Sequence, residues 1–385
     1  MMRRCRNIAA SLVVLLSIIL SVVSCNKDLD FDFGFKDLCF YHPHTAPVQV
    51  NVDWSKFRHL ETPSGMTSYV WADNSEQKIA KFRSHNLNYI TLNLLEGYYH
   101  AFVFNQTETE YTTIEFYNLD NFNKAEARVI EVKSSWYSTK LPDSKVGAEP
   151  EWLAIDCVQN IEVSEEMVAK AEAEYLATLP EAQRQQKYNE KNTKAPTKTQ
   201  NEVGPLVPTS IIKNLDIYIH LENLPYLRSA LGAVEDMAEG CYISSMSPTE
   251  NHVTHTIGSW DVIYDTTENG GVDMMKGALK GTLSTFGLPA GHSGKPDDNN
   301  IYIKLLLVDN QTILEQDFPV GDIIADLNEY NGTQLDENGK PIWPEIHLYW
   351  PEPLPEVEPV GGGTGGFDVG VGDWSDDVEI ILPLL

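Results

Sequence analysis

Alternation of apolar and polar positions is the commonest pattern along this chain, and its period of two predicts β-strands. Residues 48–54 place Val48, Val50, Val52 and Trp54 on one face. Further strands are predicted over 88–95, 98–105, 112–117 and 128–133, the first two as a hairpin around Glu96-Gly97. Because no helical segments separate these strands, they favour an antiparallel sandwich over a βαβ fold.

The pattern changes at Ser164, where apolar residues begin to recur every four positions. Met167, Ala171, Tyr175 and Leu179 would form one helix face, with Ser164 as the N-cap and Glu165 in the first turn. Residues 181–205 then contain almost no apolar side chains. This stretch predicts a linker or an exposed loop, and hence a domain boundary.

A second β-rich region is predicted from Leu206 onward. Residues 215–221 alternate, and 260–264 and 301–308 predict strands, whereas 227–238 has roughly helical spacing. Six prolines between 341 and 359 favour an extended polyproline-like run, and Gly361–Gly366 would be a flexible joint. The last residues predict a closing strand or a strand donated to a partner, with an apolar set formed by Phe367, Val369, Val371 and Trp374.

The N-terminal 25 residues have the three parts of a secretory signal peptide. Three arginines precede the apolar run 8–23, and Val-Val-Ser-Cys25 follows it. The apolar run is shorter than the roughly 20 residues that span a bilayer. The last four residues look like a bacterial lipobox, so Cys25 is predicted to carry the lipid that anchors the mature chain to a membrane.

These patterns together predict the boundaries of the chain's parts. They are a signal peptide at 1–24, a tether at 25–44, an N-terminal β-sandwich at 45–163, a helix and linker at 164–205, and a C-terminal β-sandwich at 206–385.

Charge and cysteine content narrow the classes of partner. The formal net charge is −28, and loss of the signal peptide, with three arginines and no acidic residue, would take it to −31. Such a chain repels nucleic acid and anionic lipid head groups, so neither is an expected partner. Cys39, Cys157 and Cys241 contain no CxxC pair, which argues against structural zinc. Buried free thiols are expected, and a Cys39–Cys157 disulfide is an open alternative.

No catalytic or cofactor motif stands in a suitable context. Gly361, Gly363 and Gly366 fit GxGxxG, but a Pro-Glu run precedes them and a predicted strand follows, so no cofactor is expected. The pairs His42/His44 and His252/His255 are interpreted as surface histidines, and no metal site is predicted. The chain is predicted not to be an enzyme, although a hidden pair of glycosidase carboxylates stays open. A set of aromatic residues could stack on sugars or pack in a core: Trp136, Tyr137, Trp343, Tyr349 and Trp350.

Several segments together resemble the fimbrillin-like lipoproteins of Bacteroidales-type pili. They are the lipobox, Val50-Asn-Val-Asp-Trp54, Leu95-Glu-Gly-Tyr-Tyr99, Leu215-Asp-Ile-Tyr-Ile219, Ala230-Leu-Gly-Ala233, Met237-Ala-Glu-Gly240, Gly366-Phe-Asp-Val369 and Asp373-Trp374. The resemblance implies a mainly β protein of two tandem transthyretin-like antiparallel sandwiches. It also implies export as a lipoprotein to the outer membrane.

The resemblance further implies a role in a pilus, where one subunit donates a strand to the next. Shaft subunits are trimmed after an arginine of the first domain, for which Arg58, Arg83 and Arg128 are the candidates. None of these has a convincing loop context, so an anchor or accessory subunit, or an adhesin, is expected. It would bind other pilus subunits or host or glycan ligands. The acidic residues Asp28, Asp30 and Asp32 resemble signals for surface display. The alternative is a surface glycan-binding lipoprotein that serves carbohydrate uptake.

Overall fold

The computed structural model describes a mainly β protein. The described residues are 45–56, 63–73, 78–105, 111–133, 137, 140, 145–178, 201–330, 334–337 and 341–360. They all fall within one compact unit, residues 44–385. The predicted signal peptide and tether, with Cys25 and Cys39, lie outside the described residues. So do Phe367, Val369, Val371 and Trp374.

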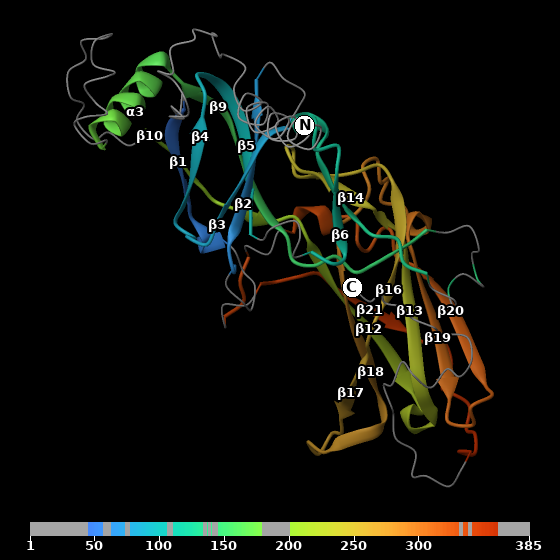
Figure 1. Cartoon of the computed structure of the whole chain (residues 1–385). Helices are drawn as coiled ribbons and strands as arrows, with labels where there is room; N and C mark the ends of the chain where they lie inside the picture. The colour runs from blue at the N-terminus through green and yellow to red at the C-terminus, as the bar shows by residue number, and fades with distance from the viewer. Residues whose placement is uncertain are drawn as a thin grey trace, which may run out of the picture. The chain divides into compact units, whose positions relative to one another are not determined.

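The first sandwich is built from two sheets that share one hydrophobic core (Figure 1). Sheet A has the order β10-β1-β4, and sheet B has the order β11-β9-β5-β2-β3. Their strands are β1 (Ala46–Val52), β2 (Met66–Ala72), β3 (Lys78–Ser84), β4 (Tyr89–Leu94), β5 (Gly97–Phe104), β9 (Ala154–Val163), β10 (Asn201–Leu206) and β11 (Thr209–Ser210).

The alternating residues at 48–54 form a strand with one buried face, as predicted. Val48, Val50 and Val52 of β1 are buried in the core between sheets A and B, and Trp54 packs against it just after the strand ends. The predicted helix is α3 (Glu165–Thr178), and the hydroxyl of its N-cap Ser164 accepts a hydrogen bond from the Met167 N–H. Met167 and Ala171 pack on the same core, as the four-residue spacing requires.

The predicted hairpin of 88–105 is wrong in its pairing. Its two strands exist, but β4 pairs with β1 in sheet A and β5 pairs with β2 and β9 in sheet B. The connection at Leu95-Glu96 therefore joins the two layers of the sandwich. Alternate residues of each strand face the shared core, so the apolar pattern is the same as that of a hairpin.

Sheet C covers the second face of sheet B. It has the order β15-β14-β7-β6 and contains β6 (Ile114–Tyr117), β7 (Glu126–Val129), β14 (Gly240–Tyr242) and β15 (Ser247–Pro248). Tyr69, Trp71, Phe102 and Phe104 point from β2 and β5 into a core that sheet C completes with residues such as Cys241. Sheet B is thus buried on both faces, because its two central strands are apolar at odd and even positions alike.

The second sandwich consists of sheets D and E, which enclose the largest apolar cluster (Figure 1). Sheet D has the order β20-β19-β13-β16-β8, and sheet E has the order β17-β18-β12-β21. The strands are β8 (Val146–Gly147), β12 (Lys213–Glu222), β13 (Leu227–Ala238), β16 (His252–Ile257), β17 (Asp261–Thr266), β18 (Val272–Thr285), β19 (Asn300–Leu307), β20 (Ile313–Pro319) and β21 (Glu345–Tyr349).

Residues 227–238, which have helical spacing in the sequence, form the strand β13. It lies between β16 and β19 and is buried on both faces over most of its length, so apolar residues occupy consecutive positions and the period of two is lost. The strand predicted at 301–308 is β19, an inner strand of sheet D.

Strands occur in two segments that the sequence predicts as a linker and as an extended polyproline-like run. Asn201–Leu206, at the end of the predicted linker, is β10 and pairs in parallel with β1. Glu345–Tyr349, within the proline-rich run, is β21 and pairs in parallel with β12. Pro205 lies within β10 and Pro344 directly precedes β21, so composition alone conceals these short strands.

The mainly β class with antiparallel sandwich sheets is confirmed. The finer transthyretin-like assignment stays a prediction. Among the described residues, no helix is long and apolar enough to cross a membrane.

Candidate functional site

Sheet E presents four aromatic and histidine side chains on its outer face. Along β12, Leu215, Ile217, Ile219 and Leu221 are buried in the core. Because successive side chains of a strand alternate between faces, Tyr218 and His220 point outward. The register of β21 places His347 beside Tyr218 and Tyr349 beside His220. We call these four residues the ring ladder.

The rings of the ladder stack in pairs across the two strands. The Tyr218 and His347 centroids are 4.7 Å apart at an interplanar angle of 12°, and those of His220 and Tyr349 are 4.6 Å apart at 13°. This spacing matches the distance of about 4.8 Å between neighbouring strands. The ring planes therefore stand up from the sheet, and their edges face the solvent.

A hydrogen bond links the two histidines diagonally across the ladder. His220 Nε2 and His347 Nδ1 are 3.0 Å apart, so one ring donates and the other accepts. Burial lowers the pKa of His220, and the neighbouring His347 lowers it further, whereas Asp265 acts in the opposite direction. The second nitrogen of His347, Nε2, lies 3.8 Å from a carboxylate oxygen of Glu345.

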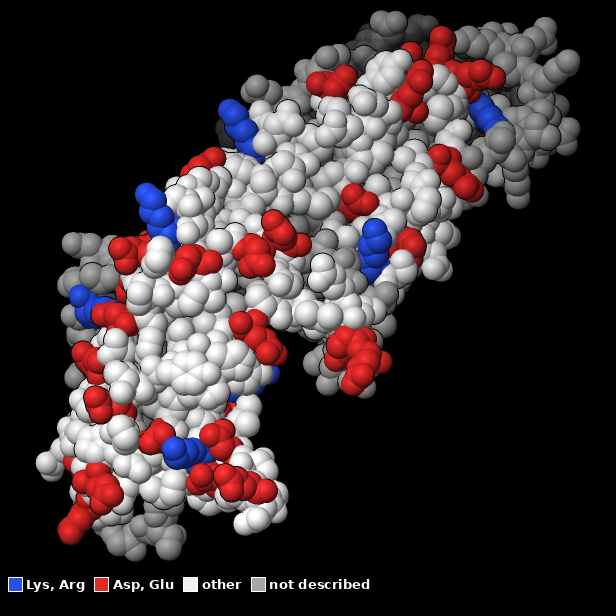
Figure 2. All heavy atoms as spheres, turned by 180° about the vertical axis from the view of Figure 1, so that it is seen from behind, with Lys and Arg blue, Asp and Glu red and all other residues white. Residues whose placement is uncertain are grey.

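Ion pairs border the ladder. Lys280 of β18 contacts Asp216 at 2.9 Å, and its Nζ lies 5.2 Å from the centroid of the Tyr218 ring. The hydrogen bond to Asp216 raises the pKa of Lys280. At the other border, Lys276 pairs with Glu222 at 2.5 Å. Figure 2 shows acidic side chains distributed over one face of the molecule with few basic ones among them.

Apolar side chains extend the surface from the ladder to the β17–β18 hairpin. One row of residues paired in register crosses all four strands of sheet E. It consists of Ile263 of β17, Ala278 of β18, His220 of β12 and Tyr349 of β21. Tyr349 is 69% exposed and Ile263 is 44% exposed. Beyond this row the hairpin also exposes Val272, Met274 and Met275. An exposed apolar surface with a charged border is typical of a site that binds another molecule.

The edge of β21 beside the ladder has main-chain groups available for pairing. In the described part of the chain, β21 pairs with β12 alone. The Asp216 N–H donates to Pro344 O at 3.1 Å, and the Trp350 N–H donates to His220 O at 3.0 Å. In this parallel pattern the alternate residues Glu345, His347 and Tyr349 direct their backbone N–H and C=O groups to the other side. Among the described residues, the ladder therefore coincides with a strand edge that has no partner.

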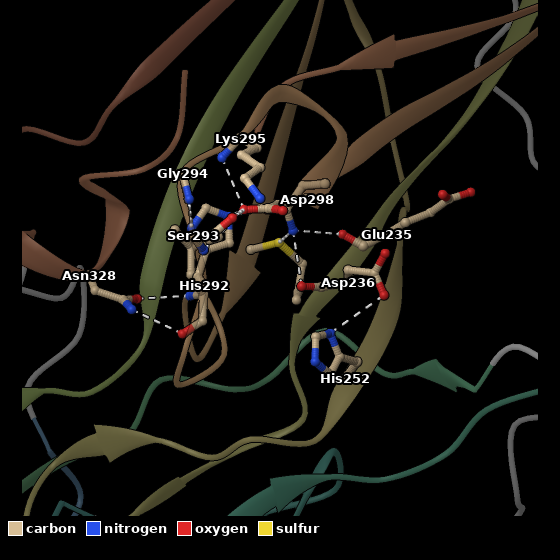
Figure 3. Close-up of polar contacts among 12 residues, drawn as sticks. Glu235, Asp236, His252, His292, Ser293, Gly294, Lys295, Asp298 and Asn328 are labelled. Carbon is tan, nitrogen blue, oxygen red and sulfur yellow. Dashed lines mark hydrogen bonds and ion pairs between the residues drawn. The ribbon is translucent and has the colours of Figure 1, made fainter. Parts of the chain in front are cut away.

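A second polar cluster lies where the 288–299 loop meets β13 (Figure 3). The buried Asn299 donates through Nδ2 to the carbonyls of Glu235 and Asp236 at 3.0 and 2.9 Å, and its Oδ1 lies 2.7 Å from His292 Nε2. Asp236 has a positive φ of 58° within the bulge of β13. Asn299 thus satisfies the carbonyls that the bulge frees, which is a structural role.

Asp298 closes the same loop. Its carboxylate accepts hydrogen bonds from the Ser293 hydroxyl and from the Ser293 and Lys295 backbone N–H groups (Figure 3). These bonds lower the pKa of Asp298 to about 2. Because its oxygen atoms are already engaged within the loop, we assign Asp298 to loop structure as well.

The histidines identified in the sequence lie in different environments. His42 and His44 lie outside the described residues. His252 and His255 are three positions apart and point to opposite faces of β16, and His252 is exposed. The prediction of a surface position is wrong for His255, which is fully buried. Burial lowers the pKa of His255 to about 4. The backbone groups of Gly147 and Ala148 act in the opposite direction and raise it.

The aromatic candidates are mostly internal. Tyr137 is buried, Trp343 packs edge-on against Trp152, and Trp350 packs edge-on against Phe318. Trp136 lies outside the described residues, so Tyr349 is the exposed member of the set that the structure describes. Sequence reasoning missed Tyr218, His220 and His347, although Tyr-Ile-His and His-Leu-Tyr were visible as mirrored triplets.

The cysteines and trimming candidates are placed as follows. Cys157 and Cys241 are free thiols, and burial raises the pKa of each to about 12.

Arg128 lies in β7, an inner strand of sheet C, where it pairs with Glu126 at 2.8 Å. Arg83 lies in the edge strand β3, and Arg58 is outside the described residues. The described residues contain no group of three or more His, Cys, Asp or Glu side chains arranged for a metal.

Comparisons with known proteins match one family. A family profile described as a domain of unknown function, DUF5119, matches residues 34–258. No curated protein matches the sequence significantly.

Several solved structures are similar in fold. A candidate adhesin from Bacteroides ovatus is 12% identical with a TM-score of 0.46, covering 81% of this chain and 94% of that one. The fimbrial anchor protein Mfa2 from Porphyromonas gingivalis is 9% identical with a TM-score of 0.40, covering 79% and 90%. A candidate polysaccharide-binding protein from Bacteroides thetaiotaomicron is 8% identical with a TM-score of 0.39, covering 79% and 90%.

Proposed function

The chain belongs to the DUF5119 family, and we propose that it is a fimbrillin-like anchor or accessory subunit, or an adhesin, that binds protein partners along the open edge of β21. The observation that carries this proposal is that, in the part of the chain that the structure describes, a strand edge without a partner coincides with the partly exposed ring ladder. Strand addition gains affinity from main-chain hydrogen bonds and specificity from alternate side chains. A partner strand beside β21 would meet both the main-chain groups of the edge and the rings of the ladder.

The ladder would set the register of the added strand. Its rings stack at the spacing of neighbouring strands, so an aromatic side chain on a third strand could continue the stack beside His347 or Tyr349. Two such side chains, two residues apart, would fit the two rows of the ladder. We therefore expect the partner segment to be extended and to carry aromatic residues at alternate positions.

Site-specific crosslinking in cells tests the binding edge. A photoreactive phenylalanine analogue in place of Tyr349 is expected to form an adduct with another fimbrillin-like subunit. Glu345→Pro removes an N–H that points to the open edge and should abolish the adduct, whereas Glu345→Ala should retain it. No intermolecular adduct, or an adduct that survives Glu345→Pro, would contradict strand addition at β21.

The chain's own C-terminal end is a competing occupant of a sheet edge. We propose that residues 367–385, with Phe367, Val369, Val371 and Trp374, close the second sandwich. Deletion of 367–385 should then abolish cooperative melting of that sandwich. If the segment is donated to a partner instead, the truncated monomer should melt normally and only assembly should fail. A crosslink from position 349 to this segment within one chain would identify it as the occupant of β21.

Anchorage to the outer membrane through a lipid on Cys25 completes the proposal. Cys25→Ala is expected to abolish acyl labelling and to move the protein from the membrane to the soluble fraction. Protease added to intact cells should remove the protein if it is displayed on the surface. Unchanged membrane retention of Cys25→Ala would overturn the lipoprotein assignment.

Glycan binding is the second candidate, supported by the exposed ring of Tyr349. Sugars stack on flat ring faces, and one face of Tyr349 already contacts His220. The remaining face could hold one sugar ring. A calorimetric screen of glycans against the soluble chain, repeated with Tyr349→Ala, separates this candidate from strand addition.

A further inference from the structure

The two histidines of the ladder share a hydrogen bond that joins β12 to β21. His220 Nε2 and His347 Nδ1 are 3.0 Å apart, and the ring planes are inclined by 27°. A contact of this kind requires one ring to donate its N–H and the other to offer a bare nitrogen. Protonation places hydrogen on both nitrogens of an imidazole and removes the bare one. The link between the two strands therefore depends on how many protons the pair holds.

The pair has three protonation states, which differ in the attraction between the rings. When both rings are neutral, one N–H donates to one bare nitrogen. One added proton turns the donor into a cation, and a hydrogen bond from a charged donor is about twice as strong. A second proton leaves two N–H groups facing each other and two positive rings whose centroids are 5.3 Å apart. The first proton therefore strengthens the contact and the second breaks it, so the pair titrates in two separate steps.

The charges around the pair direct the first proton to His347 and the second to His220. A carboxylate oxygen of Glu345, on the same strand, lies 3.8 Å from His347 Nε2, so a positive charge on His347 has a counter-charge beside it. Burial lowers the pKa of His220, the neighbouring His347 lowers it further, and Asp265 of β17 opposes both. The other charged groups on this face of sheet E lie beside one another in register or in ion pairs: Asp216 and Asp261 with Lys280, and Glu222 with Lys276. His220 therefore takes up the second proton at a pH below the ordinary histidine pKa of about 6.5.

Separation of the two rings would dismantle the ladder but leave β21 in place. Two apolar residues of β21, Ile346 and Leu348, are buried in the core, and its backbone pairs with β12. Each histidine ring is stacked on a tyrosine of the neighbouring strand. Because the strand is fixed and the side chain of His347 is 46% exposed, the rings relieve their repulsion by turning apart into the solvent. That movement removes the stacked edges that would set the register of an added strand.

We propose that the His220–His347 pair is a pH-sensitive switch for the binding edge. A partner strand binds beside β21 while the pair holds at most one added proton, and it is released when both histidines are protonated. This inference rests on the proposed strand addition at β21 and adds its regulation. Because the bound state excludes one proton that the free state takes up, the affinity falls by up to about tenfold for each pH unit below the second protonation step.

Nuclear magnetic resonance of the purified full chain, labelled with ¹⁵N in histidine, tests the coupling within the pair. His220 should titrate at lower pH in the wild-type chain than in His347→Phe, by about one pH unit, because the substitution removes the neighbouring positive charge. Far-UV circular dichroism at each pH verifies that the chain stays folded. Identical titration curves of His220 in the two proteins would show that the histidines are not coupled and would overturn the proposal.

Photocrosslinking in cells held at pH values from 7.5 to 5.0 tests the regulation. A photoreactive phenylalanine analogue replaces Glu352, which is exposed just after β21, so all four rings of the ladder stay in place. The yield of the adduct with another fimbrillin-like subunit should fall by about fivefold or more between these limits. His220→Phe and His347→Phe each keep an aromatic ring but bind no proton there, so the adduct of either variant should persist at pH 5.0.

A control and a second substitution make the result decisive. His85→Phe replaces an exposed histidine elsewhere and should leave the decline of the adduct unchanged. His347→Gln, which also binds no proton, takes the place of a phenylalanine variant that does not fold. An adduct yield that is constant from pH 7.5 to 5.0, or that declines equally in His347→Phe, would overturn the switch and leave strand addition intact. An adduct absent at every pH would contradict strand addition itself, and the switch with it.

Discussion

The buried hydroxyl of Tyr137 donates a hydrogen bond to the carboxylate of Glu235 at 2.8 Å, across 98 positions of sequence. Lys140 Nζ approaches the same carboxylate oxygen to 3.5 Å. Tyr137 belongs to a small apolar cluster with Val146 of β8, Ala233 of β13 and Tyr302 of β19. This hydrogen bond, with the apolar cluster around it, holds a segment from the first half of the chain against sheet D.

Tyr137→Phe should lower the free energy of unfolding by about 1–3 kcal/mol, because it leaves a buried carboxylate with one partner fewer. Denaturant unfolding measures the change. Tyr117→Phe is the matched control, since the Tyr117 hydroxyl also bonds a carboxylate, that of Glu115, but at an exposed position. Equal losses in the two variants would show that burial of the Glu235 pair contributes nothing.

Gly232→Ala should destabilise the second sandwich. A Cβ at position 232 would lie 2.5 Å from the Trp260 ring, which is 1% exposed and cannot move outward. Gly281 approaches the same ring from sheet E, so the indole is held between two glycines. Overpacking of this kind costs about 1–3 kcal/mol.

Gly258→Ala is the control for this prediction, because nothing lies within 4 Å of the added Cβ. It should change stability by no more than about 0.5 kcal/mol. Thermal melting of both variants measures the difference, and a Gly232→Ala melt at the wild-type temperature would contradict the packing argument.

The strands were more predictable from the sequence than their partners. Alternation at 215–221 identified β12 because one face is buried and the other is not. A connection at Leu95-Glu96 fits a hairpin within one sheet as well as a crossing between the two sheets of a sandwich. Only the packing of the complete fold distinguishes the two. The ladder was hidden for the same reason. The two triplets lie on different strands, β12 and β21, and the pairing that joins His220 to His347 spans 127 positions.

His255 should make the protein sensitive to mild acid. Its pKa is near 4 in the folded chain and has its ordinary value of 6.5 when unfolded. The unfolded chain therefore takes up a proton first as the pH falls, so stability is full above about pH 6.5 and declines toward pH 4, by about 3 kcal/mol at most. His255→Gln should flatten this part of the pH profile.

His252→Gln is the control on the same strand. His252 is exposed, so this variant removes a histidine from the same strand without altering the buried site of His255. Chemical unfolding at a series of pH values measures both slopes. If His255→Gln retains the wild-type slope, groups other than His255 cause the acid sensitivity.

Limited proteolysis should cut the chain first within 181–205, the stretch predicted to separate the two sandwiches, on the N-terminal side of β10. The contacts around it add a second expectation. β7 pairs with β14 and β8 pairs with β16, so strands on either side of the cut share sheets C and D. The core beneath sheet C likewise combines Trp71 and Phe102 with Cys241 and Phe286.

The two fragments should therefore stay associated in native buffer and separate only in denaturant. Size-exclusion chromatography of the cleaved protein measures this. Fragments that elute separately, each folded by circular dichroism, would show that the two sandwiches are independent domains, and a first cut within 206–350 would show that the boundary lies elsewhere.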